Sequence, residues 1–160
     1  FKKKYKKQST RYYNKMIFIS HRGNINGINK KFENNPKYIQ SAINKGFNVE
    51  IDVWYKDAFY LGHDRPQFKV TKRFLENKKL WCHAKNLEAL EKLQKINTKH
   101  FWHQEDDYTL TSNGFIWTYP GKKLSNKSIC VLPELKKNKL PKFISGVCSD
   151  FIEKYKNIYD

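Results

Sequence analysis

The spacing of apolar and polar positions predicts a chain of alternating strands and helices. Residues 16–20 form a short apolar run without alternation, the pattern of a strand covered on both faces. Residues 47–54 alternate instead, so the apolar side chains point to one side of a strand and Glu50 and Asp52 to the other. The second strand therefore places two carboxylates in one small space.

The segment between these two strands carries the signals of a helix. Asn35 is a favourable N-cap, Pro36 suits the first helical position, and Gly46 ends a run of apolar residues at helical spacing. Strand, helix and strand within about forty residues predict a βαβ unit with parallel strands and a right-handed crossover.

Further apolar segments bring the number of predicted strands to seven, and residues 59–61 predict an eighth pairing as a hairpin beside the acidic strand. Helices are expected after an Asn86 cap and after a Ser149 cap. Segments between the later strands are short or rich in Gly, Pro and Lys, so full helices are not expected there. The later strands are predicted at residues 80–85, 101–104, 114–119, 129–132 and 146–148.

Composition indicates one globular domain with a basic surface. The 160 residues are 39% hydrophobic and 16% aromatic, which suffices for a proper core. The formal net charge of +17 favours an anionic partner: a phosphate ester, a nucleic acid or an acidic membrane face. Three cysteines without CxxC spacing indicate neither a disulfide framework nor a zinc knuckle, which favours a reducing, intracellular compartment.

We divide the chain into a basic N-terminal arm, residues 1–15, and a folded domain, residues 16–160. The arm holds six Lys and one Arg and no acidic residue. It is interpreted as an electrostatic tether to an anionic membrane surface, or as a solvated tail without a partner. Since the sequence opens with Phe1 rather than Met, an upstream segment is expected.

Glu50 and Asp52 predict a cation site, because neighbouring carboxylates ionise together only when a positive group lies between them. A hard divalent metal ion is the obvious candidate. The alternative is an edge strand whose acidic face looks at solvent. His21 and His63 each follow a strand and suit acid or base chemistry near neutral pH, although histidines are also ordinary packed or solvent-facing residues.

Several motifs, in order and spacing, resemble the glycerophosphodiester phosphodiesterases of the phospholipase-C-like superfamily. The strong matches lie within residues 16–66, and weaker ones follow. The resemblance implies a compact (β/α) TIM-type barrel with seven or eight strands, reduced outer helices and a site at the carboxyl ends of the strands. The matching motifs are His21-Arg22-Gly23, 32–35, Glu50-x-Asp52, Asp57 with Gly62-His63-Asp64, and 146–150.

The resemblance also assigns roles. His21 and His63 would be the general acid/base pair, and Arg22 and Lys85 would bind phosphate. Mg²⁺ or Ca²⁺ would be the cofactor, and a small phosphodiester or lysophospholipid-type molecule the substrate. Sphingomyelinase D and phosphatidylinositol phospholipase C share the barrel and the two histidines, so the leaving group stays open. A nucleic-acid binder would explain the charge, but not the acidic pair or the histidines at strand ends.

One departure concerns the third metal ligand, because His83 stands where the family usually has glutamate. His83 as a ligand would shift preference towards Mn²⁺ or Zn²⁺. Alternatively, His83 binds phosphate, and two carboxylates and water hold the metal. His103 is either a site residue or a core histidine, and Glu134 is a spare ligand. The changed ligand also leaves open a catalytically altered barrel that binds phosphate or phospholipid, or acts as a scaffold.

Overall fold

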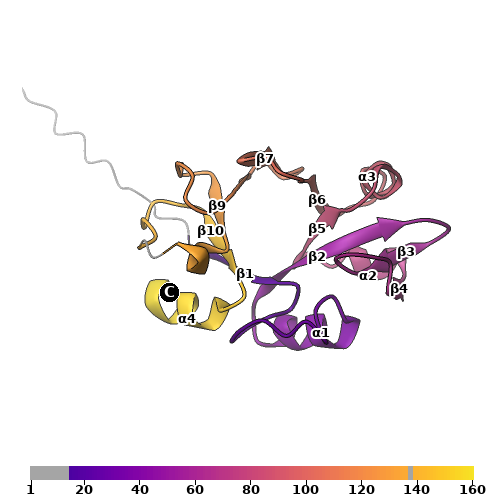
Figure 1. Ribbon diagram of the computed structural model, residues 1–160, viewed down its shortest axis with the longest axis horizontal. Coiled ribbons are helices and arrows are strands. Elements are labelled where there is room, and N and C mark those ends of the chain that lie inside the picture. Colours follow the sequence, from indigo (N-terminus) through magenta and orange to yellow (C-terminus); the bar gives the residue numbers. More distant parts are fainter. Residues whose placement is uncertain (1–14, 137–138) are drawn as a thin grey trace, which may run out of the picture.

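The computed structural model describes residues 15–136 and 139–160, which form one curved, mixed sheet of ten strands (Figure 1). The strands are β1 (Ile17–His21), β2 (Asn48–Tyr55), β3 (Phe59–Leu61), β4 (Phe68–Val70), β5 (Leu80–Ala84), β6 (Lys99–Trp102), β7 (Tyr108–Leu110), β8 (Ile116–Thr118), β9 (Ser128–Val131) and β10 (Gly146–Ser149). The helices are α1 (Pro36–Asn44), α2 (Lys72–Leu75), α3 (Leu87–Leu93) and α4 (Ile152–Tyr159), with a 3₁₀ turn, η1 (Pro133–Leu135).

Seven strands pair in parallel, in the order β6, β5, β2, β1, β10, β9, β8. These are the seven strands predicted from the sequence. The predicted hairpin is also present, since β3 pairs antiparallel with β2 through Val53 and Leu61, and β4 continues it. The carboxyl ends of the seven parallel strands consequently meet at one edge of the sheet.

The predicted TIM-type barrel is wrong, because the sheet does not close. Within the described residues, β6 pairs only with β5, and no strand ladder joins it to β7 or β8. The chain between β6 and β8 contains β7, which pairs antiparallel with β8 and takes the edge that a parallel β6–β8 pair would need. Isolated hydrogen bonds, such as that from the Ser112 amide to the His100 carbonyl, connect this region to β6.

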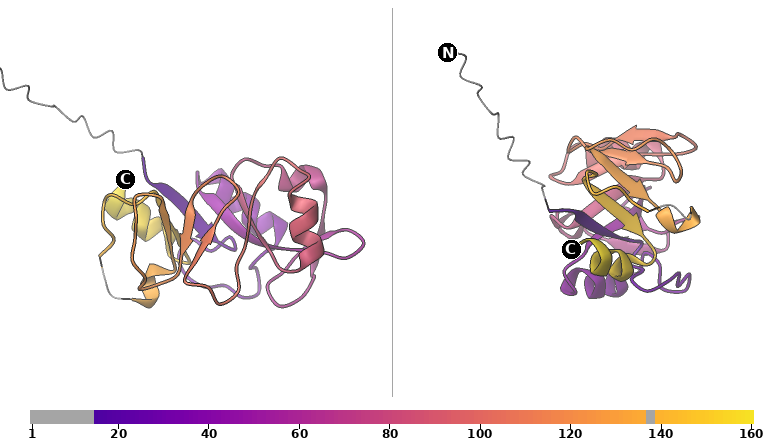
Figure 2. Two further views of the ribbon diagram at one scale, coloured as in Figure 1. Left: turned by 90° about the horizontal axis from the view of Figure 1, so that it is seen from above. Right: turned by 90° about the vertical axis from the view of Figure 1, so that its left-hand side faces the viewer.

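The helices lie on the outer, convex side of the sheet (Figures 1 and 2). Asn35 and Asn86 cap α1 and α3 as predicted, since their side chains accept hydrogen bonds from the amides of Lys37 and Ala89. The predicted Ser149 cap is wrong: Ser149 belongs to β10, and Phe151 is the residue before α4. No α-helix lies between β6 and β10 in the described residues, so the sheet is covered unevenly.

Alternation along the strands divides the core into two clusters. The predicted apolar face of β2 is buried between the sheet and the helices, with Val49, Ile51 and Val53 fully inaccessible. A second cluster fills the concave side and is mostly aromatic or branched. Its buried members are Ile19, Trp81, Phe101, Trp117, Ile129, Val131 and Cys148.

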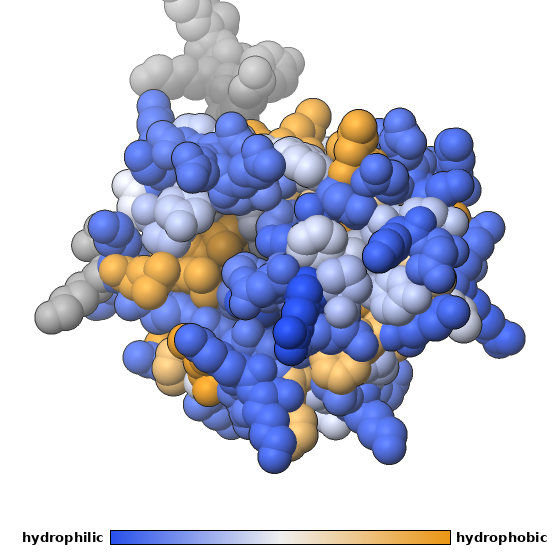
Figure 3. Space-filling view, turned by 45° about the vertical axis from the view of Figure 1, so that its right-hand side comes forward, coloured by the Kyte–Doolittle hydropathy of each residue, from blue (hydrophilic) through white to orange (hydrophobic). Residues whose placement is uncertain are grey.

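The described surface is largely polar. On the face shown in Figure 3, hydrophilic side chains dominate and apolar ones form small patches. None of the helices described is long and apolar enough to cross a membrane. The predicted basic arm lies outside the described residues except for Lys15, whose ammonium group is 3.0 Å from the Asp160 carboxylate. The three cysteines are buried free thiols.

Candidate functional site

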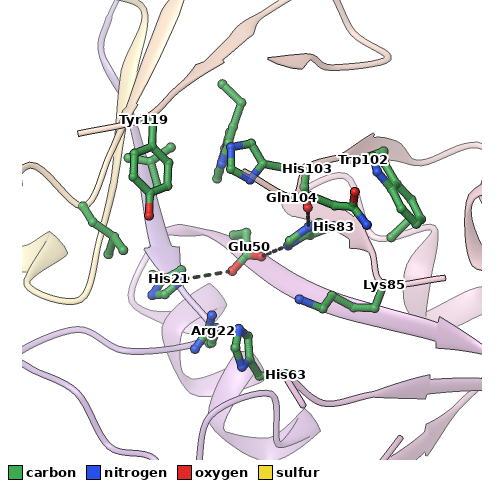
Figure 4. A pocket seen from close by; sticks show the side chains of 14 residues that line it. His21, Arg22, Glu50, His63, His83, Lys85, Trp102, His103, Gln104 and Tyr119 are labelled. Atoms are coloured by element: carbon green, nitrogen blue, oxygen red, sulfur yellow. Dashed lines mark hydrogen bonds and ion pairs between the residues drawn. The ribbon is translucent and has the colours of Figure 1, made fainter. Parts of the chain in front are cut away.

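A cavity of about 320 Å³ opens at the carboxyl ends of the parallel strands, above the concave cluster (Figure 4). Its position follows from strand alternation, because a residue two places after an inward-facing core residue faces the same side. His21 follows Ile19 in this way, and His83 follows Trp81. The polar lining comes from residues distant in the sequence, namely His21, Arg22, Glu50, His63, His83, Lys85, His103 and Gln104.

Glu50, Asp52 and His83 form a buried cluster that could hold a metal ion. Each offers one ligand atom, and these atoms lie within 4.8 Å of one another. The parallel pairing of β2 and β5 sets Asp52 opposite His83. His83 Nδ1 lies 3.2 Å from Asp52 Oδ1 and 3.7 Å from Glu50 Oε1. Glu50 is 2% exposed and Asp52 is fully buried, so water compensates little of their charge.

The donor atoms of this cluster fit a divalent cation. Within the described residues, Glu50 Oε2 and Asp52 Oδ1 are buried oxygens without a hydrogen-bond partner, which is uncommon in folded proteins. His83 Nε2–H donates to the His103 carbonyl at 2.8 Å, so Nδ1 faces the two carboxylates. Metal-binding histidines are commonly oriented by such a bond. Oxygen and imidazole ligands together suit Mn²⁺ or Zn²⁺ as well as Mg²⁺.

Cationic side chains surround the same carboxylates. Arg22 Nε lies 3.0 Å from Asp52 Oδ2, and Lys85 Nζ lies 3.6 Å from Asp52 Oδ1. Burial alone would raise the pKa of Asp52, but His83 and Arg22 outweigh it and hold that pKa well below its usual range. For His83, burial alone would lower the pKa, but the hydrogen bonds and charges of Asp52 and Glu50 outweigh burial and raise the pKa from 6.5 to about 9. A proton on His83 and a metal ion therefore compete for Nδ1.

His21 is held by a buried carboxylate that sequence analysis did not single out. Its Nδ1–H donates to Asp150 Oδ1 at 2.8 Å, and its Nε2 lies 3.9 Å from Glu50 Oε2. Burial opposes charging of the imidazole, but the bond to Asp150 and the charge of Glu50 raise the pKa of His21. Asn24 also donates to Asp150 Oδ1, at 2.8 Å. Asp150 thus orients the ring with Nε2 towards the cavity.

Asp150 could have been identified only from the pairing of β1 with β10. Ser20 in β1 pairs with Ser149 in β10, so the next residues, His21 and Asp150, emerge side by side. Without the β1–β10 pairing, a carboxylate 129 positions away from His21 carries no local hint of contact.

The loop after β1 braces Asp52. Arg22 and Asn34 adopt left-handed backbone conformations, with φ of 54° and 62°, which are uncommon for non-glycine residues, although Asn adopts them more readily than most. Asn34 Nδ2 donates to Asp52 Oδ2 at 2.9 Å, and Asn34 Oδ1 accepts from the Asp52 amide at 2.9 Å. Arg22 also bonds to Glu33 at 3.2 Å, so this predicted phosphate-binding residue lines the cavity but is anchored on two carboxylates.

Two more predicted histidines lie at the cavity rim. His63 is partly exposed, with Nδ1 2.6 Å from Asp64, on the same side as Arg22 and Lys85 in Figure 4. His103 lies across the cavity, where its ring stacks on Tyr119 with centroids 5.7 Å apart. Burial, with a smaller effect of charged His83, lowers the pKa of His103. His103 is therefore a neutral wall residue rather than part of the core.

Glu134 lies away from the cation cluster. Leu132 has a left-handed backbone, with φ of 44°, and the chain then turns through η1. This turn directs the Glu134 carboxylate to Ser149 Oγ at 3.0 Å and to the Asp150 amide at 2.9 Å. Glu134 thus supports the Asp150 backbone, and the spare ligand expected from the sequence is not brought to the site.

The candidate site is consequently defined by its geometry alone. His21, Glu50 and His83 line one cavity, Asp52 completes the buried cluster with Glu50 and His83, and cationic groups lie beside them. The likeness to glycerophosphodiester phosphodiesterases stays a prediction from sequence motifs. No family model, curated protein or solved structure matches the chain.

Proposed function

We propose that the chain is a metal-dependent phosphodiesterase that hydrolyses a glycerophosphodiester or a phospholipid-derived phosphodiester. One observation carries the proposal. The imidazole of His21, anchored through Nδ1 by Asp150, lines the same cavity as Glu50 and His83 of the candidate metal cluster, with Nε2 3.9 Å from Glu50. A positioned acid or base next to a cation site is what phosphodiester hydrolysis requires.

The residues divide the chemistry between them. A divalent cation held by Glu50, Asp52 and His83 would neutralise charge on the phosphoryl oxygens. His21 exchanges a proton with the attacking nucleophile or the leaving alkoxide through Nε2, while Asp150 stabilises the imidazolium form. Lys85, at the same cavity, adds positive charge beside the phosphate.

His63 is the second proton-transfer group in this proposal. Its partly exposed imidazole lines the cavity on the side of Arg22, and Asp64 holds its Nδ1 at 2.6 Å. That position suits transfer to a leaving alcohol that departs towards solvent.

The direct test is hydrolysis of a panel of glycerophosphodiesters and aryl phosphodiesters, after chelation and after addition of Mg²⁺, Ca²⁺, Mn²⁺ or Zn²⁺. Metal-stimulated turnover is expected, and His21→Asn should lower kcat by about 10²-fold or more. His100→Asn is the matched control, because His100 lies on β6, does not line the cavity and bonds to the Thr98 carbonyl. Absence of metal-stimulated turnover from folded protein would overturn the proposal.

A second candidate is a phosphate- or phospholipid-binding protein without turnover. It is favoured by the cations around Asp52: Arg22 at 3.0 Å and Lys85 at 3.6 Å already compensate this carboxylate without a metal ion. Such a cavity would bind an anion directly. Binding of inorganic phosphate to chelated protein, together with no hydrolysis in the panel above, would select this function over the first.

A further inference from the structure

A second cavity adjoins the candidate site. Its volume is about 550 Å³, and Arg22 and His63 line both cavities, so the two share a wall. The rest of its lining comes from the loop between β1 and α1 and from the loop between β3 and β4. These loops contribute Lys30, Glu33, Asn34, Asp64, Arg65 and Gln67.

Backbone geometry fixes both loops. Gly62 has φ of 149°, and a side chain there would meet the Arg65 carbonyl, so the chain turns tightly at this glycine. The turn is closed by a 2.9 Å hydrogen bond from the Gln67 amide to the Leu61 carbonyl. In the other loop, the Asn29 amide donates to Asn24 Oδ1 at 3.1 Å. The second cavity is therefore a formed feature of the fold.

Three cationic side chains, Arg22, Lys30 and Arg65, line this cavity together with two carboxylates. Its two carboxylates already have partners, since Glu33 bonds to Arg22 at 3.2 Å and Asp64 to His63 at 2.6 Å. Lys30 and Arg65 make no ion pair within residues 15–136 and 139–160. An arginine fork and a lysine that line one cavity suit a phosphate group.

We propose that the substrate carries a second phosphate group, a phosphomonoester on one alcohol arm, which binds between Lys30 and Arg65. This inference rests on the proposed function, because it assumes that the scissile diester lies at the cation cluster. His63 then lies between the two phosphates, since it lines both cavities. The combined space exceeds what a small, unsubstituted alcohol arm needs.

The test compares alkanediol bisphosphates with matched alkyl monophosphates by calorimetric titration, which requires no turnover. The bisphosphate should bind about tenfold more tightly, the scale of one charge-assisted hydrogen bond. The double variant Lys30→Gln with Arg65→Gln should lose this preference. Lys31→Gln with Arg73→Gln removes the same charge from exposed positions that do not line the cavity, and should keep it.

A second readout separates this proposal from the proposed function. Diesters with and without a terminal phosphomonoester are compared by kcat/KM, and the phosphorylated diester should be preferred. Hydrolysis of both at equal kcat/KM would overturn the subsite and leave the phosphodiesterase standing. Bisphosphate preference without any diester cleavage would support the subsite and remove the phosphodiesterase. Equal loss of bisphosphate preference in both double variants would reduce the effect to net charge and overturn the subsite.

Discussion

Replacing Asp150 by Asn tests how His21 is prepared for proton transfer. The hydrogen bond from His21 Nδ1 to Asp150 Oδ1, at 2.8 Å, favours the protonated imidazole, so its weakening lowers the pKa of His21. Hydrogen bonds to charged groups contribute about 1.5–3 kcal/mol, and about 1.4 kcal/mol corresponds to one pKa unit. The expected fall is therefore about one to two units.

The assay is direct titration of the His21 imidazole by NMR at fixed metal concentration, together with the pH dependence of kcat/KM. The limb of the pH–rate profile that belongs to His21 should move to lower pH by the same amount as its pKa. Glu50 and Arg22 also face His21, and both are retained in the variant. Asp107→Asn is the control, because Asp107 pairs with Lys122 at the surface. An unchanged His21 titration in Asp150→Asn would refute the proposed role of Asp150.

The remaining predictions concern His83 and the basic arm. The pKa of His83 is raised from 6.5 to about 9. The protonated imidazole therefore contributes its full stabilisation to the metal-free fold below about pH 6.5, and this contribution is lost as the pH rises through about 9. Denaturant titrations with a chelator should show unfolding free energy falling by up to about 3 kcal/mol over this interval in wild type but not in His83→Gln; a flat wild-type profile would contradict this. Calorimetric metal titrations should show His83→Glu shifting preference from Mn²⁺ or Zn²⁺ towards Mg²⁺ or Ca²⁺, and an unchanged order would remove His83 from the coordination shell. Deleting residues 1–15 should reduce salt-sensitive co-sedimentation with acidic vesicles while hydrolysis of soluble diesters is kept; equal binding would assign the attraction to the folded domain.

Local patterns were sufficient to predict the seven parallel strands, the hairpin strand β3 and the acidic pair, but not β4 or β7. Alternation along β2 correctly placed Glu50 and Asp52 on the face opposite the buried Val49 and Ile51. The Asn35 cap was likewise predictable from the sequence, because a helix cap depends on residues close to it in the chain. His83 was placed beside this pair only by the resemblance to the phosphodiesterases, and the parallel register of β2 and β5 sets Asp52 opposite His83.

Features that depend on distant pairing were not predictable from the sequence. Barrel closure depended on whether β8 would pair with β6 or with the short β7, and the three residues of β7 gave no sign of that choice. The Asp150 contact required the β1–β10 register. Glu134 follows a strand as the sequence indicated, but the left-handed backbone at Leu132 turns it towards Ser149 and Asp150.

Glu50, Asp52 and His83 are proposed to bind a divalent cation together, beside His21. A crystal structure of the protein soaked in Mn²⁺, with anomalous scattering recorded, tests this most directly. We expect an anomalous peak at coordination distance from both carboxylates and from His83 Nδ1. An empty cluster, in which Arg22 and Lys85 keep their contacts with Asp52 at saturating Mn²⁺, would show that these three residues do not form a metal site.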